Sequence, residues 1–108
     1  MTSQEIIARY FAADAKQDTD ALLVLFTADA VVVDEDHTRR GTNEIRAWRE
    51  FVASAYQYTT EILGVQSEGD GNFVARVRLE GTFPGSIVDL NHRFTIDGDR
   101  ICRLEIAP

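Results

Sequence analysis

Apolar residues recur every three or four positions in the first quarter of the chain, which is the spacing of one face of a helix. The first run follows Thr2-Ser3-Gln4-Glu5, whose T-x-x-E form is typical of a capping box, and we predict a helix that ends near Lys16. Asp18 can cap a second helix, which the apolar spacing extends to about Ala28. The apolar faces of the two helices consist of Ile6, Ile7, Tyr10, Phe11 and Ala13 in the first, and Leu22, Leu23, Leu25 and Phe26 in the second.

The pattern changes in the middle of the chain. Residues 30–33 form a short run rich in β-branched valine, which predicts a strand. The charged residues that follow as far as Gly41 are expected to form a loop. Thr42 can then cap a third helix. The residues that this helix is expected to turn inward are Ile45, Trp48, Phe51 and Val52, and those on its solvent side are Arg46, Arg49 and Glu50.

From Tyr56 onward apolar and polar residues alternate, which is the period of a β-strand. Turn-forming residues at 69–72, 84–86 and 97–98 divide this region into four strands, which we expect to pair antiparallel. In the strand 87–96 the alternation places His92 on the apolar face. In the last strand Ile101 and Leu104 are three positions apart, which predicts a β-bulge between them.

Helices followed by strands indicate an α+β domain in which helices cover one face of a sheet, and the short strand 30–33 is expected to join that sheet. The chain has 108 residues, 44% of them hydrophobic and 27% charged, and no segment resembles a linker. This composition is typical of a globular protein, so we predict one domain, residues 1–108. The net charge of −7 argues against nucleic acid and anionic lipid as partners.

Cysteine content and hydropathy bear on the compartment. The single cysteine, Cys102, excludes an internal disulfide and a zinc site with several cysteines, which favours a reducing compartment. The N-terminus does not resemble a signal peptide, and no apolar run approaches the roughly 20 residues needed to span a bilayer. We therefore expect a cytoplasmic protein without a membrane partner.

Three segments carry a family resemblance: RYFAADAKQDTDALLVLFTADAVVVDED, RRGTNEIRAW and HRFTIDGDRI. They fall in an order of helix, helix, short strand, helix and four longer strands. In this respect the chain resembles the nuclear-transport-factor-2-like superfamily, and within it the SnoaL-like polyketide cyclases and ketosteroid isomerases. The resemblance covers nearly the whole chain and implies a cone-shaped fold, in which three N-terminal helices pack on a bent mixed or antiparallel sheet and enclose an apolar pocket. The superfamily also includes non-enzymatic domains, so this fold does not determine the reaction.

The resemblance suggests a catalytic base and a hydrogen-bond donor. Asp34 matches the carboxylate that moves the proton in ketosteroid isomerases, and its place after residues 30–33 continues the inward row of that strand. Tyr10 matches the tyrosine that donates a hydrogen bond to the steroid oxygen. A buried phenol of this kind can stabilise an oxygen that gains negative charge during the reaction.

The third candidate depends on the register of one hairpin. The isomerases carry a protonated acid beside the tyrosine. His92 aligns with that acid if the turn at Asp97-Gly98 is one residue shorter than the corresponding turn of the isomerases. Without that shortening Asn91 takes the place, but an apolar pocket would not accept Asn91 together with the charged residues that share its strand face. We therefore prefer His92, which can donate or accept a hydrogen bond near neutral pH.

The remaining candidates are aromatic residues around the cavity, which would suit a small hydrophobic molecule with a carbonyl or hydroxyl group. These candidate ligand-binding residues are Phe26, Trp48, Phe51, Tyr58 and Phe94. No metal or cofactor is expected, because Asp36 and His37 lie in a loop without the helical H-x-x-x-H spacing of a zinc site and the resemblance implies none. The resemblance also makes a homodimer through the outer sheet face the expected assembly.

Two hypotheses of function remain. In the first, the protein is a cofactor-independent enzyme in which Asp34 takes a proton next to a carbonyl, while Tyr10 and His92 stabilise the enolate before isomerisation or aldol cyclisation. In the second, it is a non-catalytic ligand-binding or dimerisation domain of the same fold. The second hypothesis predicts that Tyr10 and His92 are hydrogen-bonded to each other or to the backbone.

Overall fold

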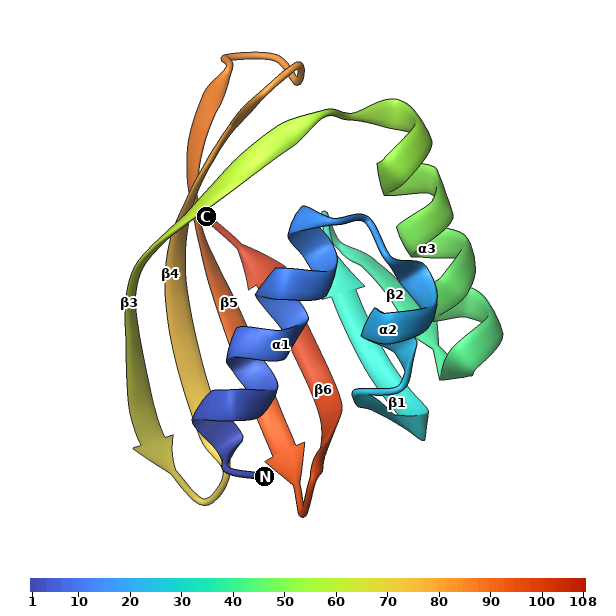
Figure 1. Ribbon diagram of the computed structural model, residues 1–108, viewed down its shortest axis with the longest axis vertical. Coiled ribbons are helices and arrows are strands. Elements are labelled where there is room, and N and C mark those ends of the chain that lie inside the picture. The colour runs from blue at the N-terminus through green and yellow to red at the C-terminus, as the bar shows by residue number, and fades with distance from the viewer.

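A six-stranded sheet forms the body of the structure, a computed structural model that describes residues 1–108 (Figure 1). The strand order is β2-β1-β6-β5-β4-β3. The β1–β6 pair is parallel and all other neighbours are antiparallel, so the sheet is mixed. The elements in chain order are α1 Ser3–Ala15, α2 Thr19–Leu23, β1 Phe26–Asp34, β2 His37–Arg40, α3 Gly41–Ala55, β3 Tyr58–Gly69, β4 Asn72–Gly81, β5 Ile87–Asp97 and β6 Arg100–Ala107.

The two N-terminal helices differ in how well the sequence predicted them. The capping box of α1 is present, with the Thr2 side chain accepting from the Glu5 backbone N–H at 3.1 Å, and the predicted end near Lys16 is confirmed. The predicted end of α2 near Ala28 is wrong, because α2 stops at Leu23 and β1 begins at Phe26. The Ile101 backbone N–H donates to the Leu25 carbonyl at 2.7 Å, and this bond brings the chain into the sheet.

Strand β2 replaces the loop that we expected after Asp34. Glu35 and Asp36 both have positive φ, 53° and 64°, and form the two-residue turn of a hairpin in which Asp34 pairs with His37. Such turns match the twist of the two strands that they join. The segment His37–Arg40 is polar throughout and has no alternation, so the sequence pattern contained no strand signal there.

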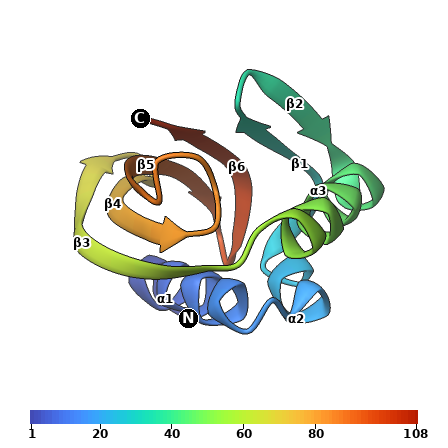
Figure 2. The ribbon, with the colours of Figure 1, turned by 90° about the horizontal axis from the view of Figure 1, so that it is seen from above.

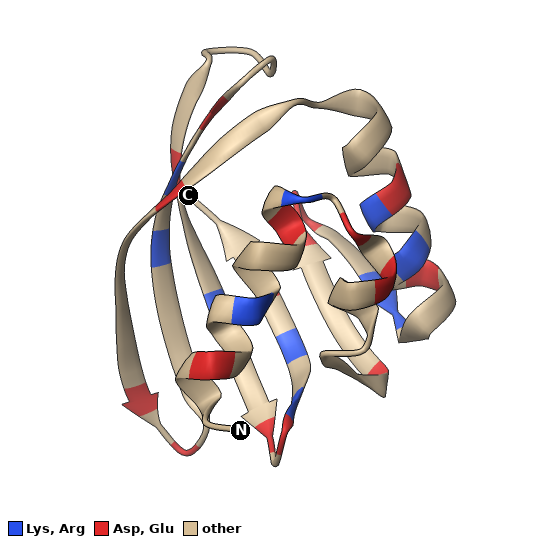
Figure 3. Ribbon diagram, viewed as in Figure 1, with Lys and Arg blue, Asp and Glu red and all other residues tan.

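Helix α3 begins at Gly41, one residue before the cap that we predicted. The N-cap residue is Arg40, whose own backbone N–H donates to the Glu44 carboxylate at 2.8 Å, and no side chain caps the first turn, so the predicted cap at Thr42 is wrong. Acidic and basic residues are interspersed along this helix (Figure 3). No helix of the structure is long and apolar enough to cross a membrane.

The sheet bends around the helices and leaves its concave side facing α1 and α3 (Figure 2). The β-bulge predicted between Ile101 and Leu104 is confirmed, because Thr95 pairs with Arg103 whereas the next residue, Ile96, pairs with Ile101. The core is one cluster of 20 buried hydrophobic residues contributed by the helices and by the inward faces of the strands. The predicted α+β class, with three helices against one bent sheet, is confirmed.

Candidate functional site

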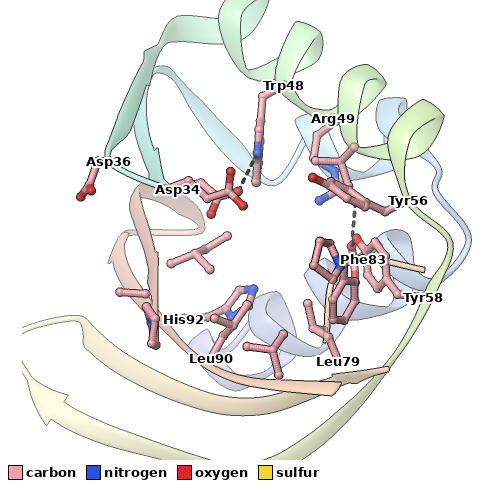
Figure 4. Close-up of a pocket in the computed structure, with 18 of the residues that line it drawn as sticks. Asp34, Asp36, Trp48, Arg49, Tyr56, Tyr58, Leu79, Phe83, Leu90 and His92 are labelled. Carbon is pink, nitrogen blue, oxygen red and sulfur yellow. Dashed lines mark hydrogen bonds and ion pairs between the residues drawn. The ribbon is translucent and has the colours of Figure 1, made fainter. Parts of the chain in front are cut away.

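A pocket of about 450 Å³ opens between α1, α3 and the concave side of the sheet. It is lined by 19 residues, of which 11 are hydrophobic, so apolar walls surround a small number of polar groups. Figure 4 shows Asp34 and Trp48 on one side of this pocket, Arg49, Tyr56 and Tyr58 on the other, and His92 at its base. This distribution matches that of small-molecule sites, in which few polar groups fix the orientation of a ligand.

Asp34 lies at the end of β1, half-buried at the pocket. Ala30 and Val32 precede it on the inward row of the strand and are fully buried. The Trp48 indole Nε1–H donates to the Asp34 carboxylate at 3.1 Å, while Arg39 donates to the Asp34 backbone carbonyl and not to its carboxylate. Burial raises the pKa of Asp34, and the hydrogen bond from Trp48 opposes this shift in part.

Tyr10 extends from the buried stripe of α1 into the pocket. Its ring contacts Phe11 and Phe94 edge to face, with centroids 5.1 Å and 5.3 Å away, which fixes its orientation. Its hydroxyl has no hydrogen-bond partner in the protein and is not sealed from solvent. Burial raises the pKa of Tyr10 well above its ordinary value, so the hydroxyl keeps its proton and can donate it in a hydrogen bond.

His92 points inward from β5, as predicted, and is 6% exposed. Asn91 lies on the other face of the sheet, where its side chain accepts from Arg76 at 3.1 Å. Burial lowers the pKa of His92 to about 4, so the ring is neutral at neutral pH. Its Nδ1 atom is buried and has no hydrogen-bond partner, which is uncommon for a polar atom in a protein interior.

The structure contradicts the prediction that Arg49 lies on the solvent side of α3. Arg49 is 5% exposed, and its Nη2 donates to the Asp14 carboxylate at 2.7 Å. The Tyr58 hydroxyl donates to the same oxygen of Asp14 at 2.6 Å, and the Thr60 hydroxyl donates to the other oxygen at 3.3 Å. We call Asp14, Arg49, Tyr58 and Thr60 the Arg49 cluster. Asp14, Arg49 and Tyr58 line the pocket, and burial raises the pKa of Tyr58 to about 12.

Helical spacing contained a signal for this ion pair. Asp14 is four residues after Tyr10, and Arg49 is four residues after Ile45, so each charge continues the apolar stripe of its own helix. A single charge on an apolar stripe is easily assigned to the solvent side. Two opposite charges on the stripes of two helices that pack on the same sheet indicate a buried pair, because each can neutralise the other.

The predicted ligand-binding aromatics fall into three groups. Trp48 and Tyr58 line the pocket. Phe26 and Phe94 do not line it and are instead buried in the core beside Tyr10. Phe51, which we expected to face inward, is 57% exposed, because it lies off the buried stripe of α3, which runs through Ile45, Trp48 and Arg49.

Several pocket residues were not among the predicted ligand-binding residues. They are Asp14, Glu35, Asp36, Arg49, Val52, Tyr56, Leu79, Phe83, Pro84, Val88, Leu90, Ile106, Ala107 and Pro108. The alternation that places His92 on the inward face of strand 87–96 does the same for Val88 and Leu90, so these two could have been added to the prediction. No group of three His, Cys, Asp or Glu side chains is placed to hold a metal ion.

Residues 7–104 match the family model of the SnoaL-like domain. A crystal structure of a proposed polyketide cyclase from Sinorhizobium meliloti is 40% identical to it, with a TM-score of 0.91 over 99% of this chain and 100% of that chain. No curated protein matches the chain.

Two more distant structures share the fold. One is a Catenulispora acidiphila protein with a ketosteroid isomerase-like fold, in complex with trimethylamine, at 22% identity and a TM-score of 0.87 over 99% of this chain and 87% of that chain. The other is an epoxide hydrolase/cyclase-like enzyme with a role in pyran ring formation in the polyether salinomycin, at 22% identity and a TM-score of 0.85 over 96% of this chain and 88% of that chain. With the family match over residues 7–104, the conclusion is that the chain belongs to the SnoaL-like family.

Proposed function

We propose that this SnoaL-like protein is an enzyme that moves a proton next to a carbonyl group of a small hydrophobic ligand. The observation that carries the proposal is Asp34, a half-buried carboxylate that lines the pocket, has no ion-pair partner and accepts one hydrogen bond, from Trp48. Desolvation raises the pKa of this carboxylate, which makes it a stronger base than a solvated aspartate. Asp34 is thus free to accept a proton from a ligand.

The reaction that fits this geometry begins with proton abstraction. The ionised Asp34 carboxylate takes a proton from the carbon next to the carbonyl, and the electron pair of the C–H bond moves to give an enolate. In an isomerisation Asp34 returns the proton to another carbon of the ligand. In an aldol cyclisation the enolate carbon instead attacks a second carbonyl of the same ligand, and the new alkoxide takes the proton. No cofactor is consumed in either case.

Tyr10 and His92 would stabilise the negative oxygen of the enolate. The Tyr10 hydroxyl keeps its proton and has no partner in the protein, so it is available as a donor. His92 is neutral near pH 7, and its buried Nδ1 has no acceptor. The proton of a neutral ring is therefore better placed on Nε2, where a ligand oxygen could accept from it.

The comparisons and the side-chain geometry support this proposal over a non-catalytic domain. The structure with 40% identity is named as a proposed polyketide cyclase, and an aldol cyclisation of a polyketide would proceed through an enolate. The non-catalytic hypothesis predicts that Tyr10 and His92 bond to each other or to the backbone, and neither side chain makes such a bond.

Hydrogen–deuterium exchange on a simple ketone tests the proposal without knowledge of the natural substrate. We expect the protein to accelerate exchange of the protons next to the carbonyl of 1-tetralone in D₂O, measured by NMR. Asp34→Asn should reduce the rate by about 10²- to 10⁴-fold, because the amide cannot accept the proton. Asp29→Asn is the matched control, since Asp29 lies on the same strand and is exposed. A protein that binds 1-tetralone without accelerating exchange, or an Asp34→Asn variant with full activity, would contradict the proposal.

A further inference from the structure

The side of the pocket away from Asp34 contains polar atoms that the fold leaves without partners. Arg49 donates to Asp14 through Nη2, and its guanidinium also interacts with the Tyr58 hydroxyl. A guanidinium has five N–H groups, so these two contacts leave others free. Because Arg49 is buried in the body of the protein and lines the pocket, its free N–H groups are available to a ligand there.

Tyr10 and His92 line the same pocket as Arg49. The charge of Arg49 lowers the pKa of both residues, and the charge of Asp14 opposes it at both, so the ion pair lies within electrostatic range of them. The Tyr10 hydroxyl also lacks a partner in the protein, whereas the unpartnered Nδ1 atom of His92 is sealed from solvent. Donors of Arg49 and Tyr10 that open into one apolar cavity indicate a place for a hydrogen-bonding ligand.

Asp14 and Trp48 hold the guanidinium in place. Asp14 binds one edge of it at 2.7 Å, and its central carbon lies 5.1 Å from the centre of the Trp48 ring. Buried ion pairs often stabilise a fold no more than hydrophobic residues of similar volume do. A cation held in this way by Asp14 is typical of a preorganised electrostatic site.

We propose that Arg49 and Tyr10 form an oxyanion-binding site that takes a phenolate or enolate oxygen of the ligand. This inference rests on the proposed function in one respect, since the oxygen that they bind is the one that becomes negative when Asp34 takes the proton. Ketosteroid isomerase-like sites are expected to use a neutral acid there, whereas this pocket offers a guanidinium. Arginine does not lose its proton at physiological pH, so it donates to the oxygen before and after the charge forms.

The shared chemistry of such ligands is an oxygen on an unsaturated carbon, at one edge of a ring or chain that fills the apolar part of the pocket. The pocket volume of about 450 Å³ lies within the range of small-molecule sites. Leu79, Leu90 and Val88 supply apolar wall between the two polar sides. We therefore assign phenols and enolisable ketones of one or two rings as the ligand class.

The ionisation of bound 4-nitrophenol tests the site directly, because its visible absorption changes when it loses its proton. The background is Asp34→Asn, which removes the competing negative charge and resembles Asp34 after it has accepted a proton. Desolvation and the charge of Asp14 raise the pKa of a phenol in this pocket, as they do for Tyr10, but direct hydrogen bonds from Arg49 and Tyr10 to the bound oxygen should outweigh them. We therefore expect the pKa of bound 4-nitrophenol to be lower than that of the free compound by about one unit or more. The same value bound and free would overturn the inference.

Variants of the ion pair show whether Arg49 causes the shift. In the Asp34→Asn background, the neutral pair Asp14→Asn with Arg49→Gln should remove most of the shift while circular dichroism shows a folded protein. Arg46→Gln is the matched control, because Arg46 lies on the same helix and pairs with Asp20 on the surface at 3.0 Å. It should keep the full shift. A shift that persists in the neutral pair would overturn the role of Arg49.

A crystal structure of Asp34→Asn with 4-nitrophenol keeps the inference testable if the neutral pair does not fold. We expect the phenol oxygen within about 3.2 Å of an Arg49 nitrogen and of the Tyr10 hydroxyl. An oxygen that binds the substituted side chain at position 34 or the Trp48 indole instead would overturn the assignment. This inference and the proposed function can fail separately. A protein that lowers the pKa of bound 4-nitrophenol but does not accelerate proton exchange of 1-tetralone would have the oxyanion-binding site without the proposed enzymatic activity.

Discussion

Asp14 and Asp34 are two carboxylates that line one pocket, and their surroundings differ. Asp14 is 5% exposed and accepts from Arg49, Tyr58 and Thr60. Asp34 is half-buried, accepts only from Trp48 and forms no ion pair. Most lone pairs of Asp14 are thus occupied, whereas Asp34 has free ones. A carboxylate surrounded by donors and a cation fixes its partners in space, while one with a single donor can exchange a proton with a ligand.

Substitution of Arg49 should have the largest effect on the difference between the two carboxylates. Arg49→Gln leaves Asp14 buried without its counterion, and we expect it to lower the free energy of unfolding by about 3–5 kcal/mol. Combining it with Asp14→Asn should recover most of this loss, because the neutral pair has no uncompensated charge. Urea unfolding of both variants measures the two values. Arg46→Gln, which alters an exposed pair on the same helix, should change stability by less than about 1 kcal/mol. An Arg49→Gln variant that is as stable as the Arg46→Gln control would contradict the prediction.

His92 should make stability depend on pH. Its pKa is lowered by burial from 6.5 to about 4, so the unfolded chain takes up the proton first as the pH falls. Stability from the neutral ring is therefore complete above about pH 6.5 and is lost between there and pH 4, by about 3 kcal/mol. Thermal unfolding across this range measures the loss. His92→Gln should remove this component, and His37→Gln, at an exposed position, should leave it. Parallel pH profiles for His92→Gln and the wild type would contradict the prediction.

Tyr10 and Tyr58 allow a matched test of the two kinds of hydroxyl. Tyr10→Phe removes a hydroxyl without a partner, so stability should change by less than about 1 kcal/mol, while exchange on 1-tetralone should slow by about 10- to 1,000-fold. Tyr58→Phe removes a donor to Asp14 and should cost about 1–3 kcal/mol of stability. Equal losses of stability in the two variants would show that the Tyr10 hydroxyl has a structural role.

Substitution of Trp48 should have the smallest effect, a small shift of the pH–rate profile. Its indole donates to Asp34 and opposes the rise in the pKa of that carboxylate. Trp48→Phe should therefore raise the pKa of Asp34 further, and the acidic limb of the pH–rate profile should move to higher pH by less than about one unit. The rate of 1-tetralone exchange as a function of pH measures this shift. A limb that stays in place or moves to lower pH would mean that another group controls it.

The sequence was most informative where simple periodicity determines the position of a side chain. The stripe of α1 and the alternation of β5 placed Tyr10 and His92 inward, and the inward row of β1 led to Asp34. These positions depend on the period of one element and on which of its faces is apolar. They required no knowledge of how distant parts of the chain meet.

The features that the sequence did not predict depend on contacts between elements. Arg49 is inward because Asp14 lies opposite it on another helix, so the buried stripe of α3 includes Arg49 and not Phe51. Charge alone favours a solvent position for an arginine, and only the counterion reverses this preference. The hairpin strand His37–Arg40 was missed for a similar reason, since it is defined by its pairing with β1 and has no pattern of its own.

The parallel pairing of β1 with β6 also has a consequence for how the protein reaches its native state. In the register of this pair Asp34 lies opposite Ile106, so segments far apart in the sequence must meet before the carboxylate is held at the pocket. Contacts between distant segments form slowly, because closing a long loop costs entropy before the contact repays it. The hairpins β3–β4 and β4–β5 join neighbouring segments and can form earlier. A nascent chain on the ribosome therefore cannot assemble this proton-accepting site until β6 has been synthesised.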